Sequence, residues 1–429
     1  MVSNGDLNTI DTAPVQKGAR RALTLLLAIN LFNYIDRYIL AAVEPNIRDH
    51  FFTPDDPDAM AKTGSLATAF LVSYMIASPV FGWLADRMPR WKLIGVSVIF
   101  WSIASAGSGL AMTFGLLILT RLFVGIGEAG YGPSAPTIIS DLFSEKKRGK
   151  VLSFFYMAIP VGSALGFFLG GQISGIWNWR YPFFVLAVPG VVLGVLCFFL
   201  REPPRGGADG QTPPKHHATM ADYLGIFRTP SYVLNTAAMI AMTFAIGGIS
   251  FWVPAYVHDF RGVPDLAAVN MKFGAITAVA GLTATLLGGL TADWVRSKLG
   301  GAYFLVSGAG MLVAFPLTVL MLRTPFPNAW YVMFFAVFFL FFNTGPSNAA
   351  IVNVTHPTVR ATAFALNIFL IHALGDAISP PLIGAIADRW NLNVAFMVVA
   401  SMMLLASIFW FIGVPFLERD TARALSRRR

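Results

Sequence analysis

Long apolar runs separated by short polar segments dominate this chain. Six runs of about 20 residues, the length that crosses a bilayer as a helix, lie between residues 23 and 201, and six more lie between 231 and 416. The stretch between them is rich in Pro, Gly and His, which is linker composition. The pattern therefore predicts an all-α membrane protein with twelve transmembrane helices. Its parts are a six-helix N-terminal half (1–201), a linker (202–230) and a six-helix C-terminal half (231–429).

Composition supports a lipid environment. Of the 429 residues, 56% are hydrophobic and 12% are charged, against roughly 25% charged in soluble domains, and the mean hydropathy is +0.64. The single cysteine, Cys197, excludes a disulfide framework and a cysteine-rich metal site. No cofactor and no cleavable signal are expected.

The basic residues collect in loops on the side predicted to hold the N-terminus, such as Arg87, Arg90 and Lys92, and in the arginine tail. The positive-inside rule places both termini in the cytoplasm. The net charge of +9 is therefore topogenic, and nucleic acid is not an expected partner. We expect a multi-pass protein of a bacterial inner (plasma) membrane, acting as a monomer.

A short motif closes two apolar runs in corresponding positions of the two halves. Gly82-Trp-Leu-Ala-Asp86 closes the second apolar run and Gly289-Leu-Thr-Ala-Asp293 closes the eighth, 207 residues later. Because this offset is about half the chain, the halves look like duplicates. Parallel six-helix repeats with the substrate path between them are a known transporter architecture.

The residues after the first copy extend it to Gly82-Trp-Leu-Ala-Asp-Arg-Met-Pro-Arg-Trp-Lys92. This run resembles the signature of the major facilitator superfamily, which implies the major facilitator fold with two pseudo-symmetric halves. Asp86 would lie at a helix C-terminus, where the macrodipole disfavours an anion, so it needs a helix N-terminus or a cation as partner. The alternative is a solvated loop charge. We expect a conformational latch formed by Gly82, Asp86, Arg87, Arg90, Arg148 and Asp293.

Two ionisable residues, Asp36 and Arg37, lie near the middle of the first predicted helix (23–47). Burying a charge at the bilayer centre costs about 3 kcal/mol on insertion scales, so such residues face a cavity or a partner. The two could neutralise each other, but adjacent helical positions point about 100° apart. We therefore expect partners on other helices.

The fourth predicted helix (115–140) supplies such partners. Arg121, Gly125 and Glu128 share one face, with the two charges about 10.5 Å apart along the axis. Burial favours a neutral carboxyl group and a nearby guanidinium favours the charged form. Asp36, Glu128 and Arg121 are therefore the candidate proton-coupling residues, and a permanently paired network is the alternative.

Candidate substrate-binding residues are Arg37, Asn343, Ser347, His372 and Asp376. His372 and Asp376 are four residues apart in the eleventh predicted helix (360–387), but such a pair could simply hydrogen-bond within the bundle. Asn343 and Ser347 lie in the tenth (329–354) and could equally serve helix packing.

Two segments, Asn33-Tyr-Ile-Asp-Arg-Tyr38 and Gly127-Glu-Ala-Gly-Tyr-Gly-Pro-Ser-Ala-Pro136 with its continuation to Phe143, resemble the Spinster branch of the superfamily. The resemblance implies export of amphiphilic lipids such as sphingosine-1-phosphate or lysophospholipids, with Asp36, Arg121 and Glu128 matching functional charges. Gly162, Gly166, Gly170 and Gly171 resemble an antiporter motif, with Phe167 where a proline would follow.

We therefore expect a proton-coupled secondary transporter that moves an amphiphilic organic molecule by alternating access. Its partners would be the lipid bilayer, the substrate and protons. A transporter of small polar organic anions or sugars is the alternative within this class. A membrane-embedded lipid enzyme would need a nucleophile with a base, which the sequence does not offer, and a channel would need a filter loop.

Overall fold

The computed structural model describes residues 18–143, 151–152, 154–205, 225–355 and 359–426, and in this part of the chain all regular structure is helical. The first bundle contains α1 Ala19–Ala42, α2 Glu44–Phe51, α3 Ala59–Arg87, α4 Arg90–Leu110, α5 Phe114–Glu128, α6 Ser134–Leu142, α8 Ala158–Ile176 and α9 Tyr181–Cys197.

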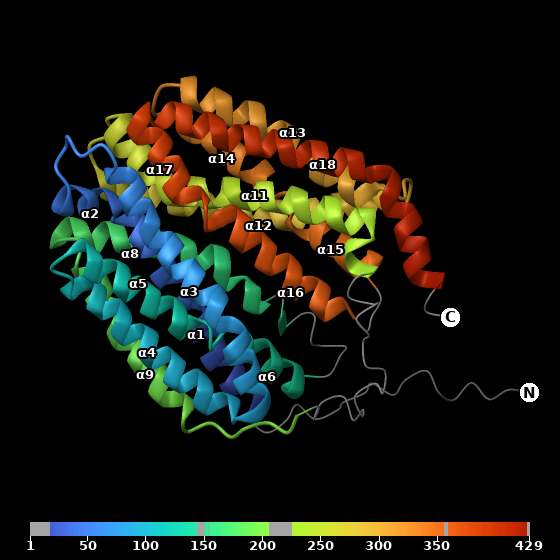
Figure 1. Cartoon of the computed structure of the whole chain (residues 1–429), viewed down its shortest axis with the longest axis horizontal. Coiled ribbons are helices and arrows are strands. Elements are labelled where there is room, and N and C mark those ends of the chain that lie inside the picture. Colours follow the sequence, from blue (N-terminus) through green and yellow to red (C-terminus); the bar gives the residue numbers. More distant parts are fainter. Residues whose placement is uncertain (1–17, 144–150, 153, 206–224, 356–358, 427–429) are drawn as a thin grey trace, which may run out of the picture.

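The second bundle begins after the segment predicted as a linker, most of which lies outside the described residues. It contains α11 Pro230–Ala255, η1 Tyr256–Phe260, α12 Leu266–Arg296, α13 Ala302–Arg323, α14 Ala329–Phe341, α15 Thr344–Val354, α16 Arg360–Ile371, η3 His372–Asp376, α17 Ser379–Arg389 and α18 Leu392–Ser426. Figure 1 shows the two bundles side by side, blue to green and yellow to red.

Among the described residues, ten helices are long and apolar enough to cross a membrane. The shorter apolar helix α9 and the interrupted pair α5 and α6 occupy two further predicted spans. The protein is therefore a multi-pass integral membrane protein of the all-α class, consistent with twelve spans.

The first span is shorter than predicted. Helix α1 ends at Ala42, and a separate short helix, α2, begins at Glu44. Pro45 has no N–H to donate to the carbonyl four residues earlier, and its ring crowds that carbonyl, which favours a break at this point. Glu44 consequently lies beyond the candidate span Ala19–Ala42.

Two breaks lie close to the predicted charged residues. Helix α5 ends at Glu128, and α6 resumes at Ser134 after a segment with two glycines and Pro133. In the second bundle, His372–Asp376 is a π-helical turn, a feature that often marks functional sites.

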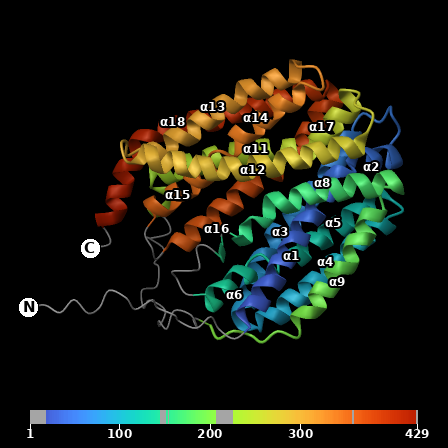
Figure 2. The ribbon, with the colours of Figure 1, turned by 180° about the vertical axis from the view of Figure 1, so that it is seen from behind.

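We call the two ends of the molecule after short helices, the α2 end and the α6 end (Figure 1). At the α2 end the two bundles are joined directly. Arg48 of α2 forms an ion pair with Asp259 of η1, and the Asn270 side chain of α12 donates to the Ala42 carbonyl at 2.9 Å. Helices α8 and α12 run alongside each other (Figure 2).

Phe167 lies in this seam between bundles. Its ring is fully buried, with ring centroids 5.3 Å from Tyr38 of α1 and 4.9 Å from Phe273 of α12. The aromatic residue at the expected proline position of the fifth predicted helix therefore packs the two bundles together.

Candidate functional site

An ion pair joins the first and fourth predicted spans. Arg37 Nε donates to Glu128 Oε2 at 2.7 Å. The Glu128 side chain has no exposed surface, whereas the Arg37 side chain is 21% exposed. The pair thus has a sealed anionic side and an accessible cationic side.

Three aromatic rings surround the Arg37 guanidinium. Its carbon lies 5.3 Å from the ring centroid of Tyr34, 5.0 Å from that of Phe70 and 5.2 Å from that of Tyr74. Guanidinium groups within about 6 Å of a ring centroid are attracted to the ring face. The rings hold the cation in place without neutralising its charge.

Asp36 points to a different set of partners. Ser105 Oγ of α4 donates to Asp36 Oδ1, and the buried Arg121 of α5 interacts with Asp36 electrostatically. Arg121 Nη2 donates to Ser108 Oγ at 2.6 Å and its guanidinium lies over the Phe183 ring. Asp36 and Arg37 therefore have different hydrogen-bond partners, although Asp36 also interacts electrostatically with Arg37, and Arg121 with Glu128.

A small cavity lies beside Asp36, lined also by Ser102 and Ser105. At about 10 Å³ it is large enough for one water molecule at most. Asp36 Oδ2 has no hydrogen-bond partner among the described residues. Only one of the two carboxylate oxygens of Asp36 therefore has a hydrogen-bond partner among the described residues.

Close helix packing brings these charges together. A Cβ atom added at Gly125 would collide with Ser73 Oγ and the Phe70 carbonyl of α3. Helix α3 therefore approaches α5 at the glycine between Arg121 and Glu128, as glycine-rich faces allow in membranes. This approach places Phe70 and Tyr74 next to Arg37.

The second bundle contributes the His372–Asp376 pair. His372 Nδ1 lies 2.9 Å from Asp376 Oδ1, and the side chains are 26% and 21% exposed. Tyr38 of α1 lies near Asp376, and its hydroxyl bonds to Ser250 of α11. Polar groups of the two bundles therefore meet at Tyr38, one residue from Arg37.

The other two candidate substrate residues lie elsewhere. Asn343 and Ser347 are both fully buried. The Asn343 amide donates to Leu340 O at 2.6 Å, and the Ser347 carbonyl accepts from Asn235 at 3.1 Å. Both are engaged within the second bundle in this structure.

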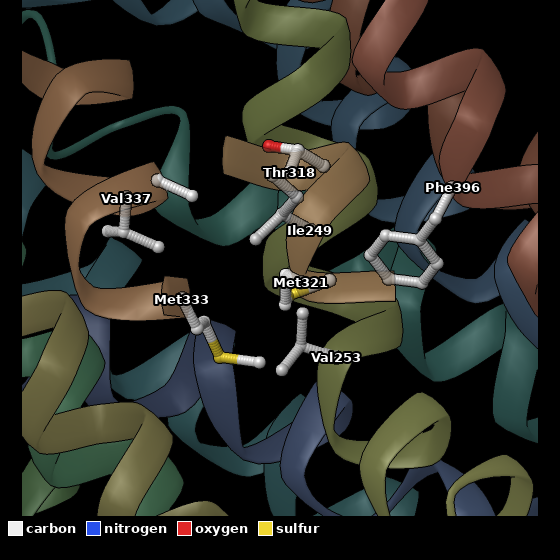
Figure 3. Close-up of a pocket in the computed structure, with 8 residues that line it drawn as sticks. Ile249, Val253, Thr318, Met321, Met333, Val337 and Phe396 are labelled. Atoms are coloured by element: carbon white, nitrogen blue, oxygen red, sulfur yellow. The ribbon is translucent and has the colours of Figure 1, made fainter. Parts of the chain in front are cut away.

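A further small cavity, also of about 10 Å³, lies inside the second bundle between α11, α13, α14 and α18 (Figure 3). Its lining is apolar except for Thr318, whose hydroxyl already donates to Ala314 O. It offers no group for a charged ligand, so we regard it as a packing void.

The candidate latch residues that the structure describes lie at the α6 end, remote from the central charges. Asp86 is exposed and its carbonyl accepts from Arg205. Arg90 is buried and pairs with Asp141 at 2.5 Å and Glu202 at 2.7 Å, within the first bundle. Asp293 accepts from the Tyr303 hydroxyl at 3.0 Å. The remaining members are Arg87, which lies over the Trp83 ring, Gly82, where an added Cβ atom would meet nothing within 4 Å, and Arg148, which is outside the described residues.

Sequence reasoning missed the aromatic residues around Arg37 and the role of Tyr38 as a link between bundles. Phe70 and Tyr74 have the four-residue spacing of one helix face, but many apolar residues in the chain share it. Tyr38 could have been selected from the sequence, because this polar side chain directly follows the two charged residues Asp36 and Arg37 in the same predicted span.

Comparisons of the sequence and the fold with known proteins identify the family. Residues 26–375 match the model of the Major Facilitator Superfamily. The fold is similar to the crystal structure of a bacterial homologue of the human lysosomal transporter Spinster in an inward-facing, unoccupied conformation. The TM-score is 0.80 and the identity 21%, covering 96% of this chain and 99% of the other.

Two curated relatives show how far the sequence similarity extends. Protein spinster of Drosophila melanogaster is 34% identical over 378 residues, which is 85% of this chain and 61% of the fly protein. The sphingosine-1-phosphate transporter SPNS2 of Mus musculus is 34% identical over 429 residues, which is 92% of this chain and 77% of the mouse protein. The chain is thus a membrane transporter of a small-molecule substrate and not an enzyme, and it belongs to the Spinster-type members of the major facilitator superfamily.

Proposed function

We propose that the protein is a proton-coupled secondary transporter of an amphiphilic anion, a lysolipid or a sphingoid phosphate. The observation that carries this proposal is the Arg37–Glu128 pair, with its accessible guanidinium and its sealed carboxylate. An anionic headgroup reaching Arg37 would compete with Glu128 for the same cation.

That competition couples the substrate to a proton. A buried carboxylate that loses its cationic partner carries a large desolvation penalty, and protonation removes the charge. Glu128 would therefore take up a proton as the substrate anion binds Arg37, and release it when Arg37 returns. Asp36 and Arg121, which bond to Ser105 and Ser108 of α4 respectively, would assist as a second site of exchange.

The aromatic surroundings of Arg37 favour an amphiphile over a sugar. Tyr34, Phe70 and Tyr74 form a largely apolar wall next to the cation, where an acyl or sphingoid chain could pack. The name of the mouse relative, a sphingosine-1-phosphate transporter, supports the same substrate class.

The α6 end would face the cytoplasm together with both termini, because the basic loops lie on that side. The bundles are joined at the α2 end, whereas a Cβ atom added at Gly82 or Gly289 at the α6 end would meet nothing within 4 Å among the described residues. We therefore interpret this conformation as inward-facing, one state of an alternating-access cycle carried out by a monomer in the plasma membrane.

A transport screen in proteoliposomes with an imposed pH gradient tests the proposal. Lysophospholipids, sphingoid phosphates, small organic anions and sugars would be offered in parallel. We expect gradient-dependent movement of a phosphate-bearing amphiphile that disappears with a protonophore. Gradient-driven transport confined to sugars or small anions would overturn the substrate class, and lipid transport indifferent to the gradient would overturn proton coupling.

A further inference from the structure

The latch motif has a third copy that the repeat of the two halves does not explain. Gly384-Ala-Ile-Ala-Asp388 closes α17 with the same Gly, Ala and Asp spacing as the copies that end at Asp86 and Asp293. The first two copies lie at the α6 end, whereas the third lies at the α2 end.

The Asp388 side chain of the second bundle forms hydrogen bonds to the first bundle. Its two carboxylate oxygens accept from the backbone N–H groups of Met60 at 3.0 Å and Ala61 at 2.8 Å. These are first-turn residues of α3, where N–H groups have no partner in their own helix and the helix dipole favours an anion. A carboxylate of the second bundle thus caps a helix of the first.

Glycines allow the backbones to approach at this point. A Cβ atom added at Gly384 would lie 2.5 Å from the Met60 carbonyl, and one added at Gly64 would lie 2.6 Å from the Pro380 carbonyl. One turn further along α3, Thr68 Oγ1 donates to the Ala377 carbonyl at 2.5 Å. The contact between α3 and α17 is therefore a continuous seam that the Asp388 cap closes at its outer end.

The opposite end of α3 provides the contrast. Helix α3 begins at this seam and ends at the α6 end with Gly82 and Asp86, where a Cβ atom added at Gly82 would meet nothing within 4 Å among the described residues. The glycine of the motif therefore packs against the other bundle at the α2 end, whereas Gly82 at the α6 end has no such close neighbour on its Cβ side.

We infer that Asp388 is a positioning residue for transport: it caps α3 when the α2 end is closed and releases α3 when that end opens. The inference rests on the proposed alternating-access cycle but not on its substrate or its proton coupling. Asp388 acts through the position of α3 and touches neither the Arg37–Glu128 pair nor the substrate.

The test measures the distance between the two bundles at each end of the molecule by spin-label distance spectroscopy. Spin labels at the exposed loop positions Asp55 and Asn328 report the α2 end, and labels at Met88 and Ser297 report the α6 end. Asp388→Asn places an amide against the two N–H donors and removes the charge. We expect the open-to-closed ratio at the α2 end to rise about tenfold, the scale of a lost charge-assisted hydrogen bond, with reciprocal closing at the α6 end.

Matched controls separate a crossing contact from general stability. Asp265→Asn removes a carboxylate that caps α12 within the second bundle, accepting from Ala268 N at 3.0 Å, and should leave both distances unchanged. Gly384→Ala should open the α2 end as Asp388→Asn does, Gly82→Ala should leave it closed, and Asp388→Glu should restore part of the closed population.

Wild-type distances in both Asp388→Asn and Gly384→Ala, in protein of normal melting temperature, would overturn the inference, and so would an equal shift in Asp265→Asn. Failure to transport any lipid would contradict the proposed function yet leave these distances as a valid test. The two proposals can therefore fail separately.

Discussion

Arg37 and Glu128 form a 2.7 Å ion pair across 91 positions of sequence. Arg37 lies in α1, and Glu128 is the last residue of α5, just before the helix breaks. The pair therefore links two helices of the first bundle at a place where one of them is interrupted.

Replacing Arg37 by Lys tests whether the guanidinium itself is required. Lysine keeps the charge but loses the planar group that contacts Glu128 and the rings of Phe70 and Tyr74 together. We expect substrate affinity to fall about tenfold in a binding assay, with normal expression. Arg419→Lys is the control, because that guanidinium also lies over a ring, Phe416, but in the last helix. Equal losses in both variants would remove Arg37 from the substrate site.

Asp86→Ala should bias the conformational cycle and leave the central site intact. The exposed Asp86 lies at the C-terminal end of α3, remote from Arg37. Without the carboxylate, the α6 end should close less often, so that transport falls several-fold while substrate affinity is unchanged. Distances between labels at Met88 and Ser297 report the population directly. Normal transport with an unchanged distance distribution would contradict a latch role.

The α2 end should respond to pH through Glu44. Burial raises the pKa of this carboxyl from its ordinary value of 4.5 to about 7, against the opposing effects of Arg48 and the Thr63 hydroxyl. Asp259 and Asp49 also face it with negative charge. The closed end therefore binds a proton more strongly than an open end with solvated Glu44.

The raised pKa of Glu44 sets the direction of the pH dependence. Stabilisation of the closed α2 end is complete below about pH 4.5 and is lost as the pH rises through about 7. Labels at Asp55 and Asn328 should show more open protein at pH 8 than at pH 5, and Glu44→Gln should flatten this dependence. A pH response that persists in Glu44→Gln would assign the effect to another group.

Much of the architecture was predictable because its signals are local. Span length, the positive loops and the duplicated motif each depend on a short stretch of sequence, and they led to the major facilitator fold. Asp36, Arg37 and Glu128 could be selected for the same reason, since a charge in an apolar run is conspicuous.

The pairing of these charges was not predictable, because it depends on how the helices are rotated about their axes. The sequence pointed to Arg121 as the cation that acts on Glu128, whereas the structure pairs Glu128 with Arg37. Asn343 and Ser347 follow a helix, α14, that is apolar on every face, so their burial within the second bundle could not be read from periodicity. Asp388 was missed because its partner is a helix N-terminus 327 residues away.

The most direct test of the account is proton-driven transport by Glu128→Gln. Glutamine keeps the size of the side chain and most of its hydrogen bonding but cannot titrate. We expect this variant to express normally and to exchange substrate between equal concentrations, while losing uptake driven by a pH gradient. Wild-type dependence of uptake on the pH gradient would contradict the account and move the coupling proton to Asp36 or Asp376.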